Sequence, residues 1–366
     1  MKKKNLFVFY GGESVEKDIS VITALQAMEN IDYTKYNVFP IYIYSDEFYY
    51  IGNYSEIQRY VSFDEKQYPK IIVIKDAAFV LKKNRIKPFC RKIDCVLLCV
   101  HGGKYEGGSL QGFLDFNNIP FTSCDVLASC LCQSKQRLKN YLASTNVFTV
   151  PSFTVSDIEQ FKIMLPKLNF SSEKYIVKPD SLGSSIGISV VSNSEEAIGA
   201  VEAALLYDNN ALVEKYIPNA KEFNCAVLKS KDGYMVGSVD EVSFKNQFLT
   251  FDDKYLSDGK YTGKSGKALH SDSPYVSSIK ELALETAKYI GSDGVIRCDF
   301  LVDKNGKIYL NEVNSVPGSL AYYLFDFDFK TLLDYLIENA LQKFKTNTSK
   351  IKCFKTSYLD KNISAK

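Results

Sequence analysis

The chain has 366 residues, which is too many for one ordinary domain and enough for two or three. Hydrophobic residues make up 46% and charged residues 24% of the chain, as in a soluble globular enzyme, and the formal net charge of +2 gives no electrostatic reason to expect a nucleic-acid or membrane partner. No apolar run approaches the ~18 residues of a membrane span, and residues 6–10 are too short a run for a signal peptide, so we expect a cytoplasmic protein.

Nine cysteines and two histidines limit the metal and redox chemistry that the chain can perform. The cysteine number is odd and no C-x-x-C pair occurs, so we expect reduced thiols in a cytosolic setting. With two histidines, the composition also argues against a zinc site built from histidine and cysteine.

The first third of the chain predicts a Rossmann-like α/β unit. An apolar strand over residues 4–10 leads through a tight turn at Gly11 and Gly12 into a helix over residues 14–29 with one apolar face. Short apolar segments predict further strands at residues 38–44, 71–74, 95–100 and 119–123. The pattern elsewhere between residues 45 and 95 gives no clear assignment.

A glycine-rich loop, residues 101–108, follows the strand that ends at Val100 and reads H-G-G-K-Y-E-G-G. Four glycines in eight residues would let the backbone approach a ligand closely. Open α/β sheets bind their ligands at the carboxyl ends of the strands, which is where this loop is expected to lie. A flexible surface loop is the alternative interpretation.

A serine-rich loop, residues 180–188, predicts a second binding element. It joins apolar strands at residues 175–179 and 189–192, so a hairpin forms whose tip offers backbone N–H groups and two hydroxyls to an anion. Lys178 lies directly before the loop, which favours phosphate binding. A linker is the alternative, and the loop is not a P-loop because no G-K-[ST] opens a helix.

The rest of the chain predicts helices, strands and two irregular segments. Helices are expected at residues 125–143, 194–206, 277–290 and 328–344, and strands at residues 211–217, 222–229 and 233–241. Residues 244–260 are aromatic, charged and irregular, which favours a mobile lid. Residues 346–366 are polar and predict a frayed tail.

A β-ribbon, residues 297–318, contains the most informative pattern. Two strands joined by a D-K-N-G turn place Arg297 and Asp299 on one face, and Glu312 and Asn314 on one face of the returning strand. If those faces coincide, a guanidinium, two carboxylates and an amide oxygen converge. Mg²⁺ usually takes one or two carboxylates plus substrate phosphates, so the ribbon predicts a magnesium site. An exposed hairpin face with mixed charges is the alternative.

Taken in order, these motifs resemble the D-alanine–D-alanine ligase family of ATP-grasp enzymes over roughly residues 5–345. The resemblance is carried by residues 11–20, 101–112, 126–135, 177–188, 213–217, 221–223, 248–255, 297–300 and 311–318. It implies an α/β and α+β fold in four parts. These are a Rossmann-like substrate domain (1–122), a central ATP-grasp subdomain with the serine-rich loop (123–210), a C-terminal ATP-grasp subdomain with the lid and metal site (211–345), and a flexible tail (346–366).

The resemblance implies an ADP-forming ligation that uses ATP and Mg²⁺. One D-alanine carboxylate attacks the γ-phosphate to form an acyl phosphate, and the amine of a second D-alanine displaces phosphate, supplying a precursor of peptidoglycan. Two Mg²⁺ ions are implied, with Mn²⁺ as an alternative. The implied partners are these small molecules, with no nucleic acid and no membrane, and a second copy of the chain in a homodimer.

The resemblance also implies roles for individual residues. Groups at the reacting centre are implied at Glu16, Ser184, Tyr255, Arg297 and Gly318. Contacts to substrate are implied for His101, Lys254, Tyr323 and Leu324. Contacts to ATP are implied for Lys135, Lys178, Ser185, Glu214, Lys215, Ile217 and Glu222. Metal binding is implied for Asp299, Glu312 and Asn314.

Within the reacting centre, Glu16 is expected to hold the ammonium of the first D-alanine. The alternative for Glu16 is that an acid in the first turn of a helix simply favours the helix dipole. Ser184 is expected to bond both Glu16 and the lid residue Tyr255. Arg297 and the backbone N–H of Gly318 are expected to stabilise the tetrahedral oxyanion.

The chain departs from the family pattern at several positions. Tyr105 and Gly107 stand where Gly and Asp are usual, and Leu249 and Thr250 stand in the lid where Tyr or Phe and Asp are usual. Tyr323 stands where a serine usually grips the acceptor carboxylate. Three hypotheses follow: a D-alanine–D-alanine ligase, a sister ligase with D-serine, D-lactate or another amino acid as the acceptor, and an ATP-binding protein without catalysis.

Overall fold

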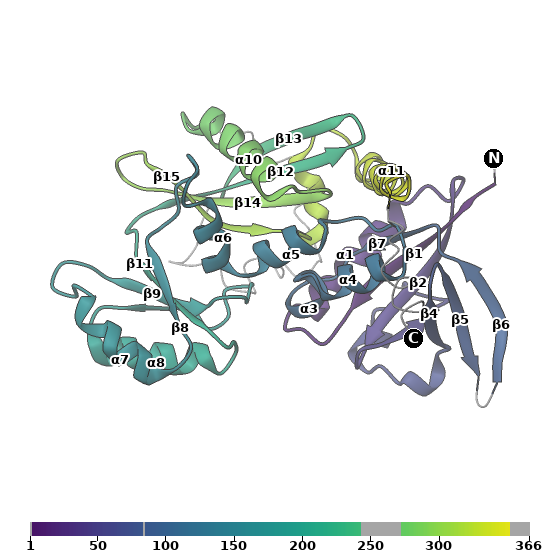
Figure 1. Ribbon diagram of the computed structural model, residues 1–366, viewed down its shortest axis with the longest axis horizontal. Coiled ribbons are helices and arrows are strands. Elements are labelled where there is room, and N and C mark those ends of the chain that lie inside the picture. Colours follow the sequence, from purple (N-terminus) through teal and green to yellow (C-terminus); the bar gives the residue numbers. More distant parts are fainter. Residues whose placement is uncertain (1, 83–84, 243–271, 352–366) are drawn as a thin grey trace, which may run out of the picture.

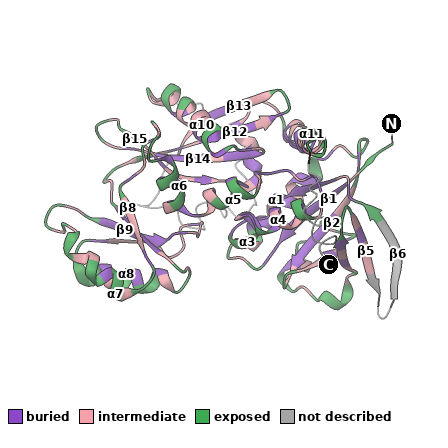
Figure 2. Cartoon of the chain, in the orientation of Figure 1, coloured by how far each residue is buried: buried purple, intermediate pink, exposed green. Residues whose placement is uncertain are grey.

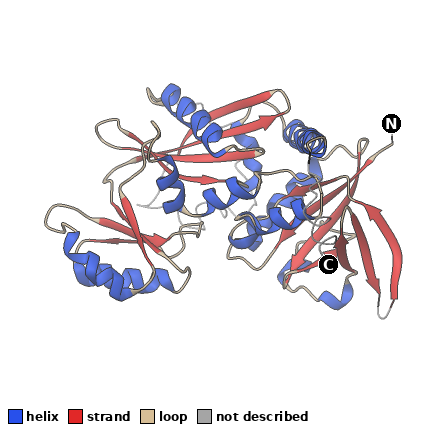
Figure 3. Cartoon of the chain, viewed as in Figure 1, coloured by secondary structure: helices blue, strands red, loops and turns tan. Residues whose placement is uncertain are grey.

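The computed structural model describes residues 2–82, 85–242 and 272–351 (Figure 1). A seven-stranded sheet and two four-stranded sheets follow one another along the chain. The seven-stranded sheet lies at one end of the molecule, the first four-stranded sheet lies at the other, and the second lies between them (Figure 3). The predicted lid, with Lys254 and Tyr255, and most of the predicted tail lie outside the described residues.

The seven-stranded sheet has the order β6-β5-β4-β3-β2-β1-β7. Its strands are β1 (Lys4–Gly11), β2 (Tyr36–Tyr44), β3 (Glu47–Tyr50), β4 (Lys70–Ile74), β5 (Ala77–Lys82), β6 (Arg85–Lys92) and β7 (Cys95–Leu98). β2, β1 and β7 run parallel, whereas β2 to β6 form an antiparallel meander. The Rossmann-like prediction therefore describes the parallel part, and the strand predicted at residues 119–123 is reduced to one bridge between Val96 and Phe121.

Two tight turns without glycine connect strands of the meander. Ser45 and Asp46 join β2 to β3 with left-handed φ angles of 48° and 62°. Lys75 joins β4 to β5 with a φ angle of 52°. Left-handed turns suit two-residue hairpins, but their usual signal is glycine or asparagine. These positions lack that signal, which is why the pattern between residues 45 and 95 gives no clear assignment.

Helix α1 (Lys17–Asn30) packs beside β1 and begins three residues later than predicted. The backbone before it forms a turn, because Ser14 N donates to Gly12 O at 3.1 Å and Glu16 N donates to Ser14 Oγ at 3.0 Å. The other helices of this part are short: α2 (Gln58–Val61), η1 (Glu65–Gln67), α3 (Gly103–Glu106) and α4 (Ser109–Phe116). The glycine-rich loop, predicted as irregular, thus contains the single turn α3.

The helix predicted over residues 125–143 is wrong as a single element. It is two helices, α5 (Val126–Gln133) and α6 (Lys135–Leu142), separated by Ser134 in an extended conformation. The Ser134 hydroxyl accepts a hydrogen bond from Arg137 N at 3.3 Å and donates one to Asp180 Oδ2 at 2.5 Å. Serine in this position is a good N-cap, so the break places Lys135 at the start of a new helix.

The first four-stranded sheet is antiparallel with the order β10-β9-β11-β8. Its strands are β8 (Ser152–Val155), β9 (Tyr175–Pro179), β10 (Ser189–Val191) and β11 (Ala211–Lys215), and its helices are α7 (Ile158–Met164), η2 (Leu165–Lys167) and α8 (Ser194–Leu205). α7 and α8 bury Phe161 and Val201 against Val177 and leave their outer sides exposed (Figure 2). The predicted hairpin of β9 and β10 around the serine-rich loop is confirmed.

The second four-stranded sheet is antiparallel with the order β13-β12-β14-β15. Its strands are β12 (Lys221–Ser230), β13 (Gly233–Val242), β14 (Val295–Val302) and β15 (Ile308–Asn314). Among the residues described after β13, the helices are α10 (Val276–Ile290), η4 (Gly318–Leu324) and α11 (Phe329–Thr348). α10 packs on the face that carries Cys298 and Phe300. Alternation along β14 therefore turns Arg297 and Asp299 to the opposite face.

One hydrophobic core joins the first and last sheets. Leu97 of β7, Leu228 of β12 and Leu332 of α11 belong to the same buried cluster. This packing fixes the loops at the carboxyl ends of β1 and β7 against the β-ribbon. α11 also runs through residues 346–348, the first three residues of the predicted tail. The predicted domain boundaries at residues 122, 210 and 345 stay a prediction.

Candidate nucleotide and metal site

The β-ribbon places its four polar side chains on one face of the sheet. Arg297 is paired across the strands with Asn314, and Asp299 with Glu312. The Arg297 guanidinium donates to both oxygens of Asp299, at 2.7 Å and 2.8 Å, and Asn314 Nδ2 donates to Asp299 Oδ2 at 3.2 Å. The faces of the two strands therefore coincide, as the alternation of the sequence predicts, and the hairpin is not an exposed surface feature because Asp299 is only 3% exposed.

The two carboxylates of the ribbon fit a magnesium ion in chemistry and number. Asp299 and Glu312 are adjacent hard oxygen donors, with the amide of Asn314 beside them. Within residues 2–82, 85–242 and 272–351, no group of three or more His, Cys, Asp and Glu side chains is placed to hold a metal ion by itself. Two carboxylates that leave positions for phosphate oxygens are what Mg²⁺ sites in phosphate-binding enzymes usually contain.

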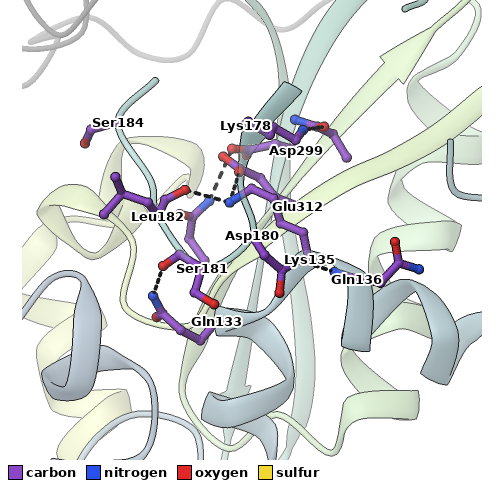
Figure 4. A network of polar contacts seen from close by, with 12 residues as sticks. Gln133, Lys135, Gln136, Lys178, Asp180, Ser181, Leu182, Ser184, Asp299 and Glu312 are labelled. Carbon is purple, nitrogen blue, oxygen red and sulfur yellow. Dashed lines mark hydrogen bonds and ion pairs between the residues drawn. The ribbon is translucent and has the colours of Figure 1, made fainter. Parts of the chain in front are cut away.

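Lys135 joins the ribbon to the serine-rich loop (Figure 4). Its ammonium donates to the carbonyl oxygen of Leu182 at 2.7 Å and lies 3.5 Å from Glu312 Oε2. Asp180 fixes the base of α6 from the loop side, because its Oδ1 accepts a hydrogen bond from Gln136 N at 2.8 Å. A cation, a loop and a carboxylate from three separate elements thus meet at one point.

The tip of the serine-rich loop has an unusual backbone. Ser184 and Ser185 both have left-handed φ angles, 56° and 59°. Such a conformation is uncommon for residues other than glycine, and it concentrates where a ligand or a contact imposes it. Here the Ser184 hydroxyl donates to Glu16 Oε1 at 2.5 Å. The loop after β9 therefore contacts the residue that precedes α1.

Glu16 lies between two loops that approach it through glycines. A Cβ atom added to Gly102 would lie 2.6 Å from Glu16 Oε2, and one added to Gly183 would lie 2.8 Å from Glu16 Oε1. At either position a side chain would displace the Glu16 carboxylate from its present place. Glu16 occupies the N-cap position of α1 without a side-chain capping bond, so the dipole alternative does not account for its orientation toward Ser184.

His101 is buried where the glycine-rich loop meets α1. Its Nε2 lies 2.9 Å from Thr23 Oγ1, and Thr23 Oγ1 also accepts a hydrogen bond from Ser319 N at 3.0 Å. Burial lowers the pKa of His101 to about 4, with a further contribution from the positive charge of Arg297, although a hydrogen bond to the backbone of Val316 acts in the opposite direction. The imidazole is therefore neutral at pH 7.

This burial predicts a pH-dependent stability. Because the folded-state pKa of His101 is about 4 and its ordinary value is 6.5, the unfolded chain takes up a proton first as the pH falls. The contribution of neutral His101 to the free energy of unfolding, which is complete above pH 6.5, should be lost as the pH falls from 6.5 to 4. The loss should approach about 3 kcal/mol in the free energy of unfolding. Urea unfolding across this range should show a shallower pH slope for His101→Gln, and identical slopes in both chains would contradict the assignment.

Glu106 is a buried acid of the glycine-rich loop that the sequence interpretation missed. Its carboxylate accepts hydrogen bonds from Gly102 N and Val316 N, both at 3.0 Å, and from the Ser315 hydroxyl at 3.3 Å. Burial and the nearby charge of Glu16 raise its pKa to about 7. It ties the glycine-rich loop to the segment that precedes Gly318. A lone acid among glycines was the available signal, and it does not reveal such partners.

Glu214 lies between two lysines, one of which carried no predicted role. Lys178 Nζ is 2.6 Å from Glu214 Oε1, and Lys139 Nζ bonds Glu214 Oε2. All three side chains are buried, with Glu214 only 2% exposed. Burial acts to raise the pKa of Glu214, but the charges of Lys178 and Lys139 outweigh it and lower the pKa, so the carboxylate stays ionised. Lys139 was missed because the helix pattern does not show which of its polar residues are buried.

The remaining ATP residues predicted by resemblance line the end of β11 and the start of β12. Lys215 ends β11 and pairs with Glu173 at the surface, so any nucleotide contact from it would come from the backbone. β11 ends two residues before the predicted end of the strand, so Ile217 lies beyond it. Glu222 shares a sheet face with Asp299, since Asn224 is the cross-strand neighbour of Asp299. Their contacts to ATP stay predictions.

The segment that follows the ribbon carries the residues predicted for the acceptor. Gly318 begins the short helix η4, in which Leu320 and its two neighbours have left-handed φ angles near 50°. The ring of Tyr323 is half-buried and lies edge-on to Tyr322, with ring centroids 6.1 Å apart. The Leu324 side chain is fully buried against the core, so the structure gives it a packing role. Substrate contacts from these residues stay predictions.

These groups together indicate a class of site. Cations from α6 and β9 lie beside a loop rich in backbone N–H groups, and a pair of carboxylates lies across from them on β14 and β15 (Figure 4). That combination suits an enzyme that binds a nucleoside triphosphate together with a divalent metal ion.

Comparisons with known proteins identify the family within that class. Residues 5–124 match the family described as D-ala D-ala ligase N-terminus, and residues 147–333 match D-ala D-ala ligase C-terminus. A D-alanine–D-alanine ligase of Thermosipho melanesiensis is 36% identical, over 95% of this chain and 99% of the relative. One of Helicobacter pylori is 34% identical, over 96% and 97%. The chain belongs to the D-alanine–D-alanine ligase family.

Solved structures agree with this family in fold. The D-Ala:D-Ser ligase VanG from Enterococcus faecalis superposes with a TM-score of 0.78 at 30% identity, covering 93% of this chain and all of that one. The D-alanine-D-alanine ligase from Coxiella burnetii superposes with a TM-score of 0.76 at 25% identity, covering 95% and 97%. Among the residues that the structure describes, no helix combines the length and apolar character needed to cross a membrane.

Proposed function

We propose that this chain is an ATP-dependent ligase that joins D-alanine to D-alanine through an acyl phosphate and forms ADP. One observation carries the proposal. The 2.5 Å contact between Ser184 and Glu16 brings the serine-rich loop, where phosphate is expected, against the carboxylate expected to hold the D-alanine ammonium. A donor bound there would present its carboxylate to the γ-phosphate. The product would serve as a precursor of peptidoglycan, and a cytoplasmic homodimer stays a prediction.

ATP is proposed to lie between the two four-stranded sheets. Lys135 and Lys178 would contact its phosphates, because both ammonium groups are buried at the meeting point of the loop and the ribbon. The backbone and hydroxyl of Ser185 would add hydrogen bonds to phosphate. Glu222 would bind the ribose hydroxyls from the exposed end of its strand.

We propose that the site binds two Mg²⁺ ions, which would be held by Asp299, Glu312 and Asn314. When bound, the metal supplies positive charge that offsets the charge developing on the transferred phosphoryl group. The Arg297 guanidinium neutralises Asp299 through two hydrogen bonds. Arg297 and the backbone N–H of Gly318 would stabilise the oxyanion that forms when the second amine attacks.

Phosphate release tests the proposal directly. The purified chain with ATP and Mg²⁺ should release phosphate when D-alanine is added, and omission of Mg²⁺ should prevent it. A panel that pairs D-alanine with D-serine, with other D-amino acids and with the hydroxy acid D-lactate would define the acceptor. Release that requires no D-alanine, or no release with any acceptor in the panel, would contradict the proposal.

A ligase that transfers D-alanine to D-serine is the second candidate. Two observations favour it: Tyr323 stands where the family usually has serine, and the similar fold of VanG belongs to a D-Ala:D-Ser ligase. The longer tyrosine side chain would donate a hydrogen bond from its hydroxyl to the acceptor carboxylate, or the tyrosine ring would narrow the pocket for the acceptor.

We expect Tyr323→Ser to change KM for the acceptor more than KM for the donor, because only the acceptor is proposed to contact this side chain. Steady-state kinetics with each candidate acceptor would measure both constants. Tyr322→Phe is a matched control, since the stack of Tyr322 on Phe329, with centroids 4.5 Å apart, does not need the hydroxyl. Equal shifts in both KM values for Tyr323→Ser would contradict the acceptor assignment.

A further inference from the structure

Three buried charges lie at the base of the serine-rich loop. Lys139 of α6 and Lys178 of β9 are each 5% exposed, and they bond the two oxygens of Glu214, which is 2% exposed. With all three groups ionised, two positive charges and one negative charge leave the group with one net positive charge. Burial lowers the pKa of Lys139, and the negative charge of Glu214 opposes that shift. Buried charges persist in a folded protein only when partners compensate the loss of water, so this excess charge needs a reason.

The two lysines differ in what else they contact. Lys178 Nζ also lies 3.3 Å from Asn311 Oδ1 on β15, next to the metal-binding end of the ribbon. Lys139 Nζ donates instead to the carbonyl oxygen of Val150 at 3.1 Å, on the segment that leads into β8. Lys178 thus lies toward the proposed nucleotide site, whereas Lys139 bonds Glu214 on the side away from that site.

We infer that Lys139 is a positioning residue that neutralises Glu214, so that the charge of Lys178 is available to the phosphates of the nucleotide. Without Lys139, Lys178 and Glu214 would form a neutral buried pair and would offer phosphate little net attraction. With Lys139 present, its positive charge neutralises the negative charge of the Glu214 carboxylate. The inference rests on the proposed role of Lys178 at the phosphates and adds to it a residue that does not touch the nucleotide.

Comparing a nucleotide with its nucleoside separates this role from a structural one. We expect Lys139→Met to weaken ADP binding about tenfold, as loss of one nearby charge at a partly screened site would, and to leave adenosine binding within about twofold. Calorimetry on the full chain would measure both ligands without relying on turnover. Lys162→Met is the control, because Lys162 forms an exposed pair with Glu159. Equal losses for ADP and adenosine would overturn the inference.

A double variant tests the charge argument. Lys139→Met combined with Glu214→Gln removes one positive and one negative charge, so the net charge of the group returns to +1. The ratio of ADP affinity to adenosine affinity should return to within about threefold of that of the unaltered chain, even if both ligands lose contacts to Glu214. Thermal unfolding of each variant would verify folding. No recovery of the ratio would overturn the inference.

Lys178→Met distinguishes the two ways in which the account can fail. If this variant leaves the ADP-to-adenosine ratio unchanged, the proposed phosphate role of Lys178 is wrong, and the inference fails with it. If Lys178→Met lowers the ratio but Lys139→Met does not, only the role of Lys139 is wrong. Lowered ratios in both variants support the inference.

Discussion

Replacing Arg297 with alanine is expected to lower the turnover number by about 10²–10³ while ATP affinity changes no more than a few-fold, because the guanidinium is proposed to act on the oxyanion of the transition state. Arg297 is oriented by hydrogen bonds to both oxygens of Asp299. Steady-state kinetics would give the turnover number, and nucleotide calorimetry would give the affinity.

Two further variants make the Arg297 result specific. Arg297→Lys keeps the positive charge but loses the bidentate hydrogen bonding of the guanidinium. Its turnover number should therefore lie between those of Arg297→Ala and the unaltered chain. Arg59→Ala is the control, because Arg59 of α2 pairs with Glu56 at the surface and its loss should leave turnover unchanged. Unchanged turnover in Arg297→Ala would rule out the oxyanion role.

Asp299→Asn is expected to have the second large effect. The change keeps the size of the side chain and an oxygen for Arg297, but it removes a negative charge from the proposed metal site. We expect turnover to fall by about 10²–10⁴, corresponding to several kcal/mol of lost charge stabilisation. The Mg²⁺ concentration needed for half-maximal rate should rise in the same variant.

Metal binding can be followed separately from catalysis for this variant. Mn²⁺ titration in the presence of ADP, monitored by electron paramagnetic resonance, should show weaker binding to Asp299→Asn than to the unaltered chain. Glu241→Gln is the control, because Glu241 on the same sheet pairs with Lys221 at the surface. Equal Mn²⁺ affinity in Asp299→Asn and the unaltered chain would contradict the metal assignment.

The sequence predicted the ribbon and the placement of its polar side chains because the information was local. Strand alternation and the D-K-N-G turn are enough to place Arg297, Asp299, Glu312 and Asn314 on common faces, and the register confirms it. The serine-rich hairpin was predictable for the same reason. In both cases the side chains and the turn that orients them lie within about twenty residues of each other.

Other features depend on partners far away in the chain. Lys139 lies in a polar helix, and only tertiary packing shows that it bonds Glu214, 75 residues later. Glu106 bonds Val316, 210 residues later. The break at Ser134 depends on capping by a hydroxyl that Asp180 also engages. Helical periodicity cannot report such contacts, because it records which residues are apolar and not what the polar ones meet.

An isotope-transfer measurement tests the central claim most directly. D-alanine labelled with ¹⁸O in both carboxylate oxygens would be supplied with unlabelled ATP and Mg²⁺, and the released phosphate would be examined by mass spectrometry. If the donor carboxylate attacks the γ-phosphate and the amine then displaces it, one ¹⁸O atom should appear in each phosphate. Phosphate without ¹⁸O would show that ATP is cleaved by water, and it would contradict the ligase mechanism.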